Sequence, residues 1–355
     1  MEKNNIQAKF KFCQWELITD CNLECEGCQV RNKITAGYQH PKIEFVISCI
    51  DDLICAGVQN LEFIGGEPLL YRDLPAALEY LNRQKEIKRF AILTNAISRD
   101  ALQRIKPELS QEKGGLAVSI NYTLEQCDEL LSAGIDTGMV KKSIAGWKAL
   151  EEFSEHCWVR ANCAVNKING ANLAEIALKV AKTGGSFSLC PLIYKREKYD
   201  SGLEFTFRSP VVGLAAVKND RKTIERSIME IRKLKREYPK QIIPSEDYLK
   251  MVIESCKDSA KPYSANCGGL GLPYLRVSSE VGKSLRDGKT SFRLRACSDI
   301  KGSDIPRLVT SDLRDSNIRK RLPFIYQSDA EVKKCCEREG CVWSVTHLLA
   351  PKALL

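Results

Sequence analysis

Strand-like and helix-like segments alternate over residues 10–210, and this rhythm constrains the fold more than any other feature of the chain. Short apolar runs of strand length are each followed by a segment whose apolar residues recur at helical spacing. Repeated βα units of this kind build a parallel sheet. Six units predict an α/β fold with an open, partial (β/α)6 barrel of the TIM type rather than a closed barrel of eight. The expected strands are Phe12–Thr19, Leu61–Ile64, Phe90–Leu93, Leu116–Ile120, Trp158–Val165 and Phe187–Leu192.

The rhythm changes after Pro210. The segment Thr223–Arg236 has isoleucines on one helical face and basic residues on the other, and Ser245–Ile253 has the pattern of a shorter helix. We interpret the basic face as the solvated side of a packed helix rather than as a surface for nucleic acid or for an anionic leader peptide. The expected parts are a core over residues 1–210, a helical connection over 211–255 and a small cysteine-bearing C-terminal domain over 256–355.

Composition excludes several classes of protein. The 355 residues carry a net charge of +9, and no run of eighteen apolar residues is present, so we expect no membrane-spanning helix. The first residues, MEKNNIQAKFKF, are charged and lack the apolar stretch of a signal peptide. We therefore expect a cytoplasmic protein that does not act on membranes or nucleic acid.

Three of the sixteen cysteines lie within eight residues, in the stretch ITDCNLECEGCQV. Cys21, Cys25 and Cys28 have C-x3-C-x2-C spacing. Thiolates are soft ligands that select zinc and iron–sulfur clusters, and a structural zinc site is normally closed by four ligands. The nearest other candidates are His40 and Cys13, and Cys13 belongs to the preceding strand-like segment. The loop is therefore one ligand short of a closed site, which leaves a position open for chemistry at the metal.

Polar and small residues follow the predicted strands where those strands end. In barrels of this type the functional residues gather at the carboxyl ends of the strands. The residues at or near such ends are Cys21, Gly65, Thr94, Ser119 and Asn166. The predicted functional site is at this edge of the sheet.

The motifs at the first three strand ends resemble those of the radical S-adenosylmethionine (SAM) superfamily. They are the cysteine loop, GGEP at Gly65–Pro68 and LTNA at Leu93–Ala96, and the resemblance covers about residues 10–210. It implies a [4Fe-4S] cluster held by the three loop cysteines, whose fourth iron binds SAM. It also implies reductive cleavage of SAM to a 5′-deoxyadenosyl radical, hydrogen abstraction from an organic substrate, and an electron donor such as flavodoxin or ferredoxin. The enzyme would be an oxidoreductase or a transferase.

The same resemblance implies a set of cofactor-binding residues. Gly65 and Gly66 would let the backbone approach the methionyl amino group, Glu67 would orient a neighbouring backbone or the ammonium, and Pro68 would stiffen the turn. For Ser119, Asn121, Asn166 and Lys167, capping of a strand end or exposure to solvent explains the residue equally well. The residues expected to contact the methionyl carboxylate or the ribose are Thr94, Asn95, Ser119, Asn121, Asn166 and Lys167.

One position of the loop departs from the family pattern. Members of the family usually carry an aromatic residue just before the third cysteine, where it packs by the adenine. This chain has Gly27 at that position. The departure leaves the cluster unaffected and implies that the adenine contact comes from elsewhere.

A second group of cysteines resembles the auxiliary-cluster extensions called SPASM and twitch domains. The matching segments are NCGGLG, FRLRACSD and KKCCEREGCVW. The resemblance implies one additional [4Fe-4S] cluster, and a zinc site with the same ligands is the alternative. His40, His156 and His347 are scattered, and we interpret them as surface or core residues. The candidate ligands are Cys267, Cys297, Cys341 and one of Cys335 and Cys336.

The substrate is not encoded in any motif. About twenty residues precede the cysteine loop, so we expect no N-terminal peptide-recognition domain. This favours a small molecule, such as a sugar or a natural-product intermediate, over a ribosomally made peptide. The alternatives are maturation of such a peptide, adenosyl transfer to an unsaturated substrate, and a non-enzymatic iron–sulfur or zinc protein.

Overall fold

The computed structural model describes residues 12–25, 28, 40–55, 57–166, 168–191, 221–255, 274–280, 291–295 and 308–310. The auxiliary iron–sulfur or zinc site, the adenine contact inferred from Gly27 and the three-part domain division therefore stay predictions. The residues of interest that lie outside the described set are Gly27, Lys167, Cys267, Cys297, Cys335, Cys336, Cys341 and His347.

The strands form one sheet in the order β6-β5-β4-β3-β2-β1-β7-β8-β9. Strands β1 to β6 are all parallel to their neighbours, which confirms the predicted six βα units. Strand β7 adds to the free edge of β1 in parallel, and β8 and β9 continue the sheet in antiparallel pairing. The bounds are β1 Phe12–Ile18, β2 Asn60–Gly65, β3 Arg89–Thr94, β4 Gly115–Ser119, β5 Trp158–Val165, β6 Ser186–Pro191, β7 Tyr274–Glu280, β8 Ser291–Arg295 and β9 Leu308–Thr310.

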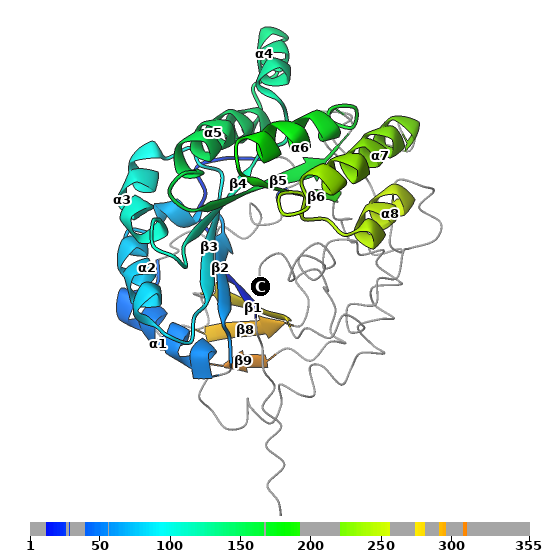
Figure 1. The fold of residues 1–355 in the computed structure, drawn as a ribbon. Coiled ribbons are helices and arrows are strands. Elements are labelled where there is room, and N and C mark those ends of the chain that lie inside the picture. Colours follow the sequence, from blue (N-terminus) through cyan, green and yellow to red (C-terminus); the bar gives the residue numbers. More distant parts are fainter. Residues whose placement is uncertain are drawn as a thin grey trace, which may run out of the picture.

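Helices cover the outer face of the curved sheet (Figure 1). Between β4 and β5 the chain forms two helices, and the first of them, α4, projects away from the barrel (Figure 1). A short 3-10 helix, η2 (Pro68–Leu70), follows the GGEP motif. The helices are α1 Ile43–Cys55, α2 Leu74–Arg83, α3 Arg99–Leu109, α4 Leu124–Ser132, α5 Gly138–Phe153, α6 Leu173–Lys182, α7 Arg221–Glu237 and α8 Glu246–Ser255.

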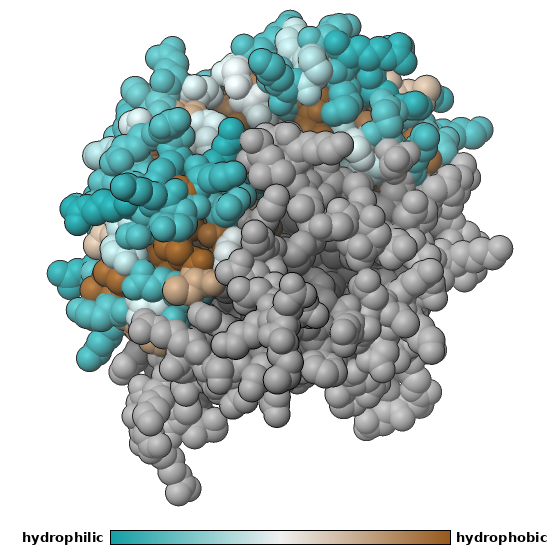
Figure 2. All heavy atoms as spheres, turned by 60° about the horizontal axis from the view of Figure 1, so that its bottom comes forward, coloured by the Kyte–Doolittle hydropathy of each residue, from teal (hydrophilic) through white to brown (hydrophobic). Residues whose placement is uncertain are grey.

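The core lies between the sheet and these helices. Trp15 of β1 and Phe63 of β2 are fully buried, with ring centroids 5.6 Å apart. In α7 the three isoleucines Ile224, Ile228 and Ile231 are fully buried, which confirms that the basic helix is packed on the barrel. Most of the described surface visible in Figure 2 is hydrophilic. No helix of the described residues is long and apolar enough to cross a membrane.

Three buried, hydrogen-bonded polar side chains span the concave face of the sheet. Arg160 of β5 donates to the carboxylate of Glu62 of β2, although β3 and β4 separate these strands in the sheet. The amide of Gln14 on β1 donates to the other oxygen of Glu62. The side chains of Arg160 and Glu62 are only 4% and 2% exposed. Strands β2 and β5 are not neighbours in the sheet. This contact therefore shows that the sheet curves enough for side chains on its inner face to reach one another across the barrel interior.

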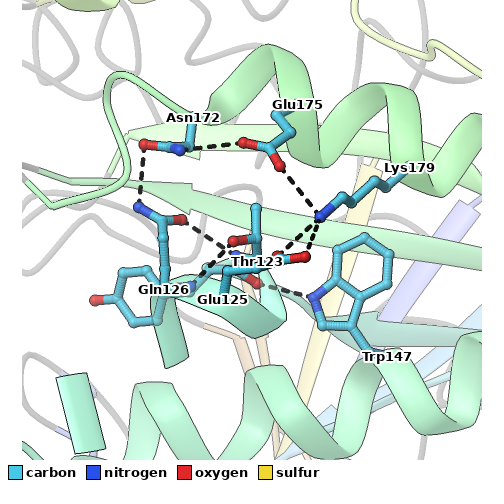
Figure 3. A network of polar contacts seen from close by, with 8 residues as sticks. Thr123, Glu125, Gln126, Trp147, Asn172, Glu175 and Lys179 are labelled. Carbon is cyan, nitrogen blue, oxygen red and sulfur yellow. Dashed lines mark hydrogen bonds and ion pairs between the residues drawn. The ribbon is translucent and has the colours of Figure 1, made fainter. Parts of the chain in front are cut away.

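The start of α4 is anchored by the polar network in Figure 3. Thr123 caps the helix in a capping box with Gln126. The Gln126 amide donates to Asn172 Oδ1 of the α6 N-terminus at 3.1 Å, and Lys179 of α6 pairs with Glu125 at 2.8 Å. These contacts fix α4 to α6, and with them the path of the chain toward the start of α5.

Candidate functional site

The cysteine loop starts where β1 ends. Cys21 and Cys25 are half-buried and Cys28 is exposed. The Cys28 N–H donates to the Cys25 carbonyl at 3.3 Å, which closes a turn between the second and third cysteines. Burial raises the pKa of the Cys21 thiol, and a backbone hydrogen bond from Leu23 opposes that effect. The three thiols therefore follow the carboxyl end of β1, as predicted from the place of the loop directly after the first strand.

The two glycines of GGEP are packed against the start of this loop. A Cβ at Gly65 would lie 2.2 Å from the Ile18 carbonyl oxygen, and one at Gly66 would lie 2.0 Å from the Asp20 carbonyl oxygen. The Gly66 N–H donates to the Ile18 carbonyl at 2.8 Å, and the Glu67 N–H donates to the Asp20 carbonyl at 2.7 Å. No side chain fits between the two backbones, so the glycines are required by the loop itself. This reason is additional to the predicted approach of the cofactor.

Glu67 joins the end of β2 to the end of β3. Its carboxylate is buried and accepts from the Leu69 N–H at 3.0 Å, the Thr94 hydroxyl at 2.6 Å and the Asn95 N–H at 2.7 Å. Burial raises its pKa to about 7, although the three hydrogen bonds favour the charged form. The side chain thus orients neighbouring backbone, one of the two roles predicted for it, and Pro68 starts η2 beside it.

The LTNA turn faces the cysteine loop. The Asn95 amide nitrogen donates to Asn22 Oδ1 at 2.7 Å and lies 3.9 Å from the Cys21 sulfur. Its amide oxygen accepts from the Ile97 N–H at 3.0 Å. Ala96, the residue between, has a left-handed φ of 59°. The turn therefore directs the nitrogen of Asn95 toward the first cysteine.

Asn121 stands at the far side of this edge, after β4. Its Oδ1 accepts from the Ala164 N–H of β5 at 2.8 Å, and its own N–H donates to the Ser143 hydroxyl at 2.9 Å. The side chain is buried, yet Nδ2 has no hydrogen-bond partner among the described residues. A buried donor without a partner is costly, and such donors are rare in folded proteins. Ser119, two residues earlier, is half-buried at the end of the strand.

Asn166 uses every polar atom of its side chain within the protein. Its Nδ2 donates to the Ala164 carbonyl at 3.1 Å, and its Oδ1 accepts from the N–H groups of Ile168 and Asn169 at 2.9 and 3.1 Å. The residue is fully buried. The geometry is that of a strand-end cap, the alternative considered for it, and a contact with the cofactor stays a prediction.

Sequence reasoning missed three residues beside the cysteine loop. A Cβ at Gly138, the first residue of α5, would lie 2.6 Å from the Cys25 sulfur. The His40 ring lies 2.9 Å from the carboxylate of Asp20, directly before Cys21, although it was interpreted as an ordinary surface or core histidine. Asn22 receives the Asn95 amide. For Asn22, its position directly after Cys21 was a signal in the sequence. For Gly138 and His40 there was none, because spacing alone does not reveal which helix or histidine contacts the loop.

The donor set suits a cluster better than a single ion. Thiolates select iron–sulfur centres and zinc. Within the described part of the chain, no three His, Cys, Asp or Glu side chains lie close enough together to hold one metal ion. The cysteines of a cubane attach to different irons, so their sulfurs need not converge on one point. Gly138 also leaves room for the Cys25 sulfur. The residues therefore fit a cluster held by one loop.

The comparison with protein families decides the assignment. Residues 15–153 match the model of the Radical SAM superfamily. The protein carries a radical SAM superfamily domain. A domain of this kind implies a [4Fe-4S] cluster and SAM. The matched segment of this radical SAM domain contains the cysteine loop, GGEP, LTNA and the end of β4.

Curated relatives resemble this domain over part of their length. The GTP 3′,8-cyclase of Thermodesulfovibrio yellowstonii is 26% identical over 130 residues, which is 36% of this chain and 38% of the relative. The GTP 3′,8-cyclase of Clostridium botulinum strain Hall is 31% identical over 134 residues, 36% of this chain and 40% of the relative. The chain thus spans about two fifths of the length of these enzymes.

Two solved structures share the fold. Streptococcus suis SuiB bound to SAM has a TM-score of 0.57 at 14% identity, covering 90% of this chain and 64% of SuiB. The enzyme anSMEcpe with bound SAM has a TM-score of 0.56 at 17% identity, covering 91% and 79%. Both likenesses support the partial-barrel fold.

Proposed function

We propose that the protein is a radical SAM enzyme that cleaves SAM reductively and abstracts hydrogen from a small polar organic molecule. One observation carries the proposal. Continuous hydrogen bonds join the cysteine loop to GGEP and LTNA, through the Glu67 N–H to Asp20 and the Glu67 carboxylate to Asn95. When bound, the cluster and SAM supply an electron transfer that breaks a C–S bond and gives a 5′-deoxyadenosyl radical.

The chain's own residues hold the reactants in this proposal. Cys21, Cys25 and Cys28 ligate the cluster, and the backbone at Gly65 and Gly66 receives the methionyl amino group. The free Nδ2 of Asn121 supports a role in binding an acceptor such as the methionyl carboxylate, because that donor is buried without a protein partner. An external donor such as flavodoxin or ferredoxin supplies the electron.

The barrel interior supports a polar substrate. Gln14, Glu62 and Arg160 form a charged, hydrogen-bonded floor on the inner face of the sheet. Curated relatives are named GTP 3′,8-cyclase, which also favours a small molecule. The structural neighbours include SuiB bound to its precursor peptide SuiA, so peptide maturation is the second candidate.

A second cluster belongs to the proposal as a separate part. The cysteines after residue 256 would hold one additional [4Fe-4S] cluster that takes an electron from the substrate radical. Zinc at the same ligands is the alternative.

Anaerobic reconstitution tests the cluster part. Iron and sulfide are counted on the native protein and on the Cys21→Ala, Cys25→Ala, Cys28→Ala triple variant. We expect about eight irons per chain, falling to about four in the variant. A native count near four that falls to zero would remove the auxiliary cluster but keep the SAM site, and zinc is measured in the same samples.

Mass spectrometry tests the reaction. The reduced protein is incubated with SAM, first alone and then with candidate small molecules or peptides. Free 5′-deoxyadenosine that depends on the loop cysteines supports cleavage and abstraction. An adenosylated product would instead indicate transfer, and intact SAM with a reduced cluster would indicate a binding protein without this activity.

A further inference from the structure

The side chain of Asn95 is aimed at the sulfur of the first loop cysteine. Its Nδ2 lies 3.9 Å from Cys21 Sγ, at the long end of the range for a hydrogen bond to sulfur. The second proton of the amide goes to Asn22 Oδ1 at 2.7 Å. The amide therefore contacts both the thiol and the residue next to it in the loop.

The orientation of this amide is fixed by its other end. Asn95 Oδ1 accepts from the Ile97 N–H at 3.0 Å. If the amide were reversed, an N–H would face the Ile97 N–H and an oxygen would face Asn22 Oδ1, and both contacts would be repulsive. Only the observed orientation satisfies all partners, so an N–H points toward Cys21.

The backbone of Asn95 is held as firmly as its side chain. Its N–H donates to the buried Glu67 carboxylate at 2.7 Å, and Thr94 donates to the same carboxylate at 2.6 Å. Asn95 itself is 8% exposed. The donor is therefore preorganised and does not need to move when the loop takes up a cluster.

We propose that Asn95 is a positioning residue that donates a hydrogen bond to the Cys21 sulfur and raises the reduction potential of the cluster. This rests on the proposed function, because it takes Cys21 as a cluster ligand. Reduction adds one negative charge to a cluster, and a donor at a ligand sulfur stabilises the more negative form more strongly. Hydrogen bonds to the sulfurs are among the factors that set iron–sulfur potentials. The role differs from the cofactor contact that the motif predicts for Asn95.

An electron paramagnetic resonance redox titration tests the proposal without SAM. The signal to follow is the one that the triple cysteine variant lacks, so the auxiliary site does not interfere. The variants are Asn95→Leu, which removes the donor, and Asn95→Asp, which keeps the shape but replaces the donor with a negative oxygen. Asn172→Leu is the matched control, because its amide also bonds two side chains but lies at the α6 N-terminus.

We expect Asn95→Leu to make reduction about tenfold less favourable, which is about 59 mV for a one-electron couple. Asn95→Asp should lower the potential further, and Asn172→Leu should match the native protein. A purely structural role would predict the opposite order, with the isosteric aspartate close to the native value. An unchanged potential in Asn95→Asp, or loss of the cluster from both Asn95 variants, would overturn the proposal.

The two proposals fail in different ways. A native protein that cleaves SAM while its Asn95 variants keep the native potential would overturn the inference alone. If the Asn95 variants show the expected shift in potential but the native protein leaves SAM intact, the proposed function alone would be overturned.

Discussion

The two halves of the carboxyl edge of the barrel use their polar residues differently. At the ends of β1 to β3, Glu67 and Asn95 direct their side chains toward the cysteine loop and the turns beside it. At the ends of β4 and β5, Asn121 and Asn166 bond to β5 and to the turn after it. One buried donor, Asn121 Nδ2, has no partner there among the described residues. The first half joins the cysteine loop to its neighbouring turns, and the second keeps one buried donor available.

Removing the Glu67 carboxylate should have the largest effect on stability. In Glu67→Ala the donors at Leu69, Thr94 and Asn95 lose their acceptor, and each buried unsatisfied donor costs about 1–3 kcal/mol. We expect a loss of about 4 kcal/mol in the free energy of unfolding at pH 6, measured by urea unfolding of the apoprotein. The control is Glu79→Ala, whose exposed pair with Arg83 is worth about 0–1 kcal/mol. Equal losses in the two variants would contradict the comparison.

The raised pKa of Glu67 predicts a specific dependence of stability on pH. The pKa is about 7 in the folded protein against an ordinary 4.5, so folding favours the protonated form. The stabilisation is complete below about pH 4.5 and is lost as the pH rises through 7, by about 3 kcal/mol. The free energy of unfolding of the apoprotein, measured from pH 5 to 8, should fall relative to that of Glu67→Gln. A difference that does not vary with pH would show that Glu67 keeps its ordinary pKa.

The free donor of Asn121 predicts a loss of cofactor affinity when it is removed. In Asn121→Asp the Oδ1 that accepts from Ala164 is kept, whereas the Nδ2 donor becomes an oxygen. We expect binding of SAM to the reconstituted protein to weaken about tenfold, or about 1.4 kcal/mol, in anaerobic equilibrium dialysis. An unchanged dissociation constant would remove Asn121 from the cofactor site.

Local pattern was enough to predict the parallel strands and the packed helices. The strand Trp158–Val165 was predicted at both ends, and the helix predicted over Ser245–Ile253 agrees with α8 to within two residues at each end. Apolar runs report burial, and burial on both faces is what a parallel sheet imposes on its strands. The motif at Gly65–Pro68 likewise follows from spacing within one stretch of chain.

Partners far apart in the sequence were beyond such reasoning. Arg160 meets Glu62 across 98 positions of sequence, and neither residue forms part of a motif. Asn121 and Asn166 looked equivalent in the sequence, because both are asparagines just after a strand. Their difference arises from Ala164. Its N–H donates to the amide oxygen of Asn121, and its carbonyl accepts from the amide nitrogen of Asn166. Only the paired strands bring these groups together.

The smallest predicted effect on SAM binding separates those two asparagines. In Asn166→Asp the acceptor for Ile168 and Asn169 remains, but an oxygen replaces the nitrogen that donates to the Ala164 carbonyl. We expect a loss of about 1–3 kcal/mol in the free energy of unfolding, because the Ala164 carbonyl loses its donor and faces an oxygen at a buried position. Binding of SAM should equal that of the native protein, because each polar atom of the Asn166 side chain already has a partner in the protein. A weakened SAM affinity in Asn166→Asp with an unchanged affinity in Asn121→Asp would reverse the assignment of the two residues.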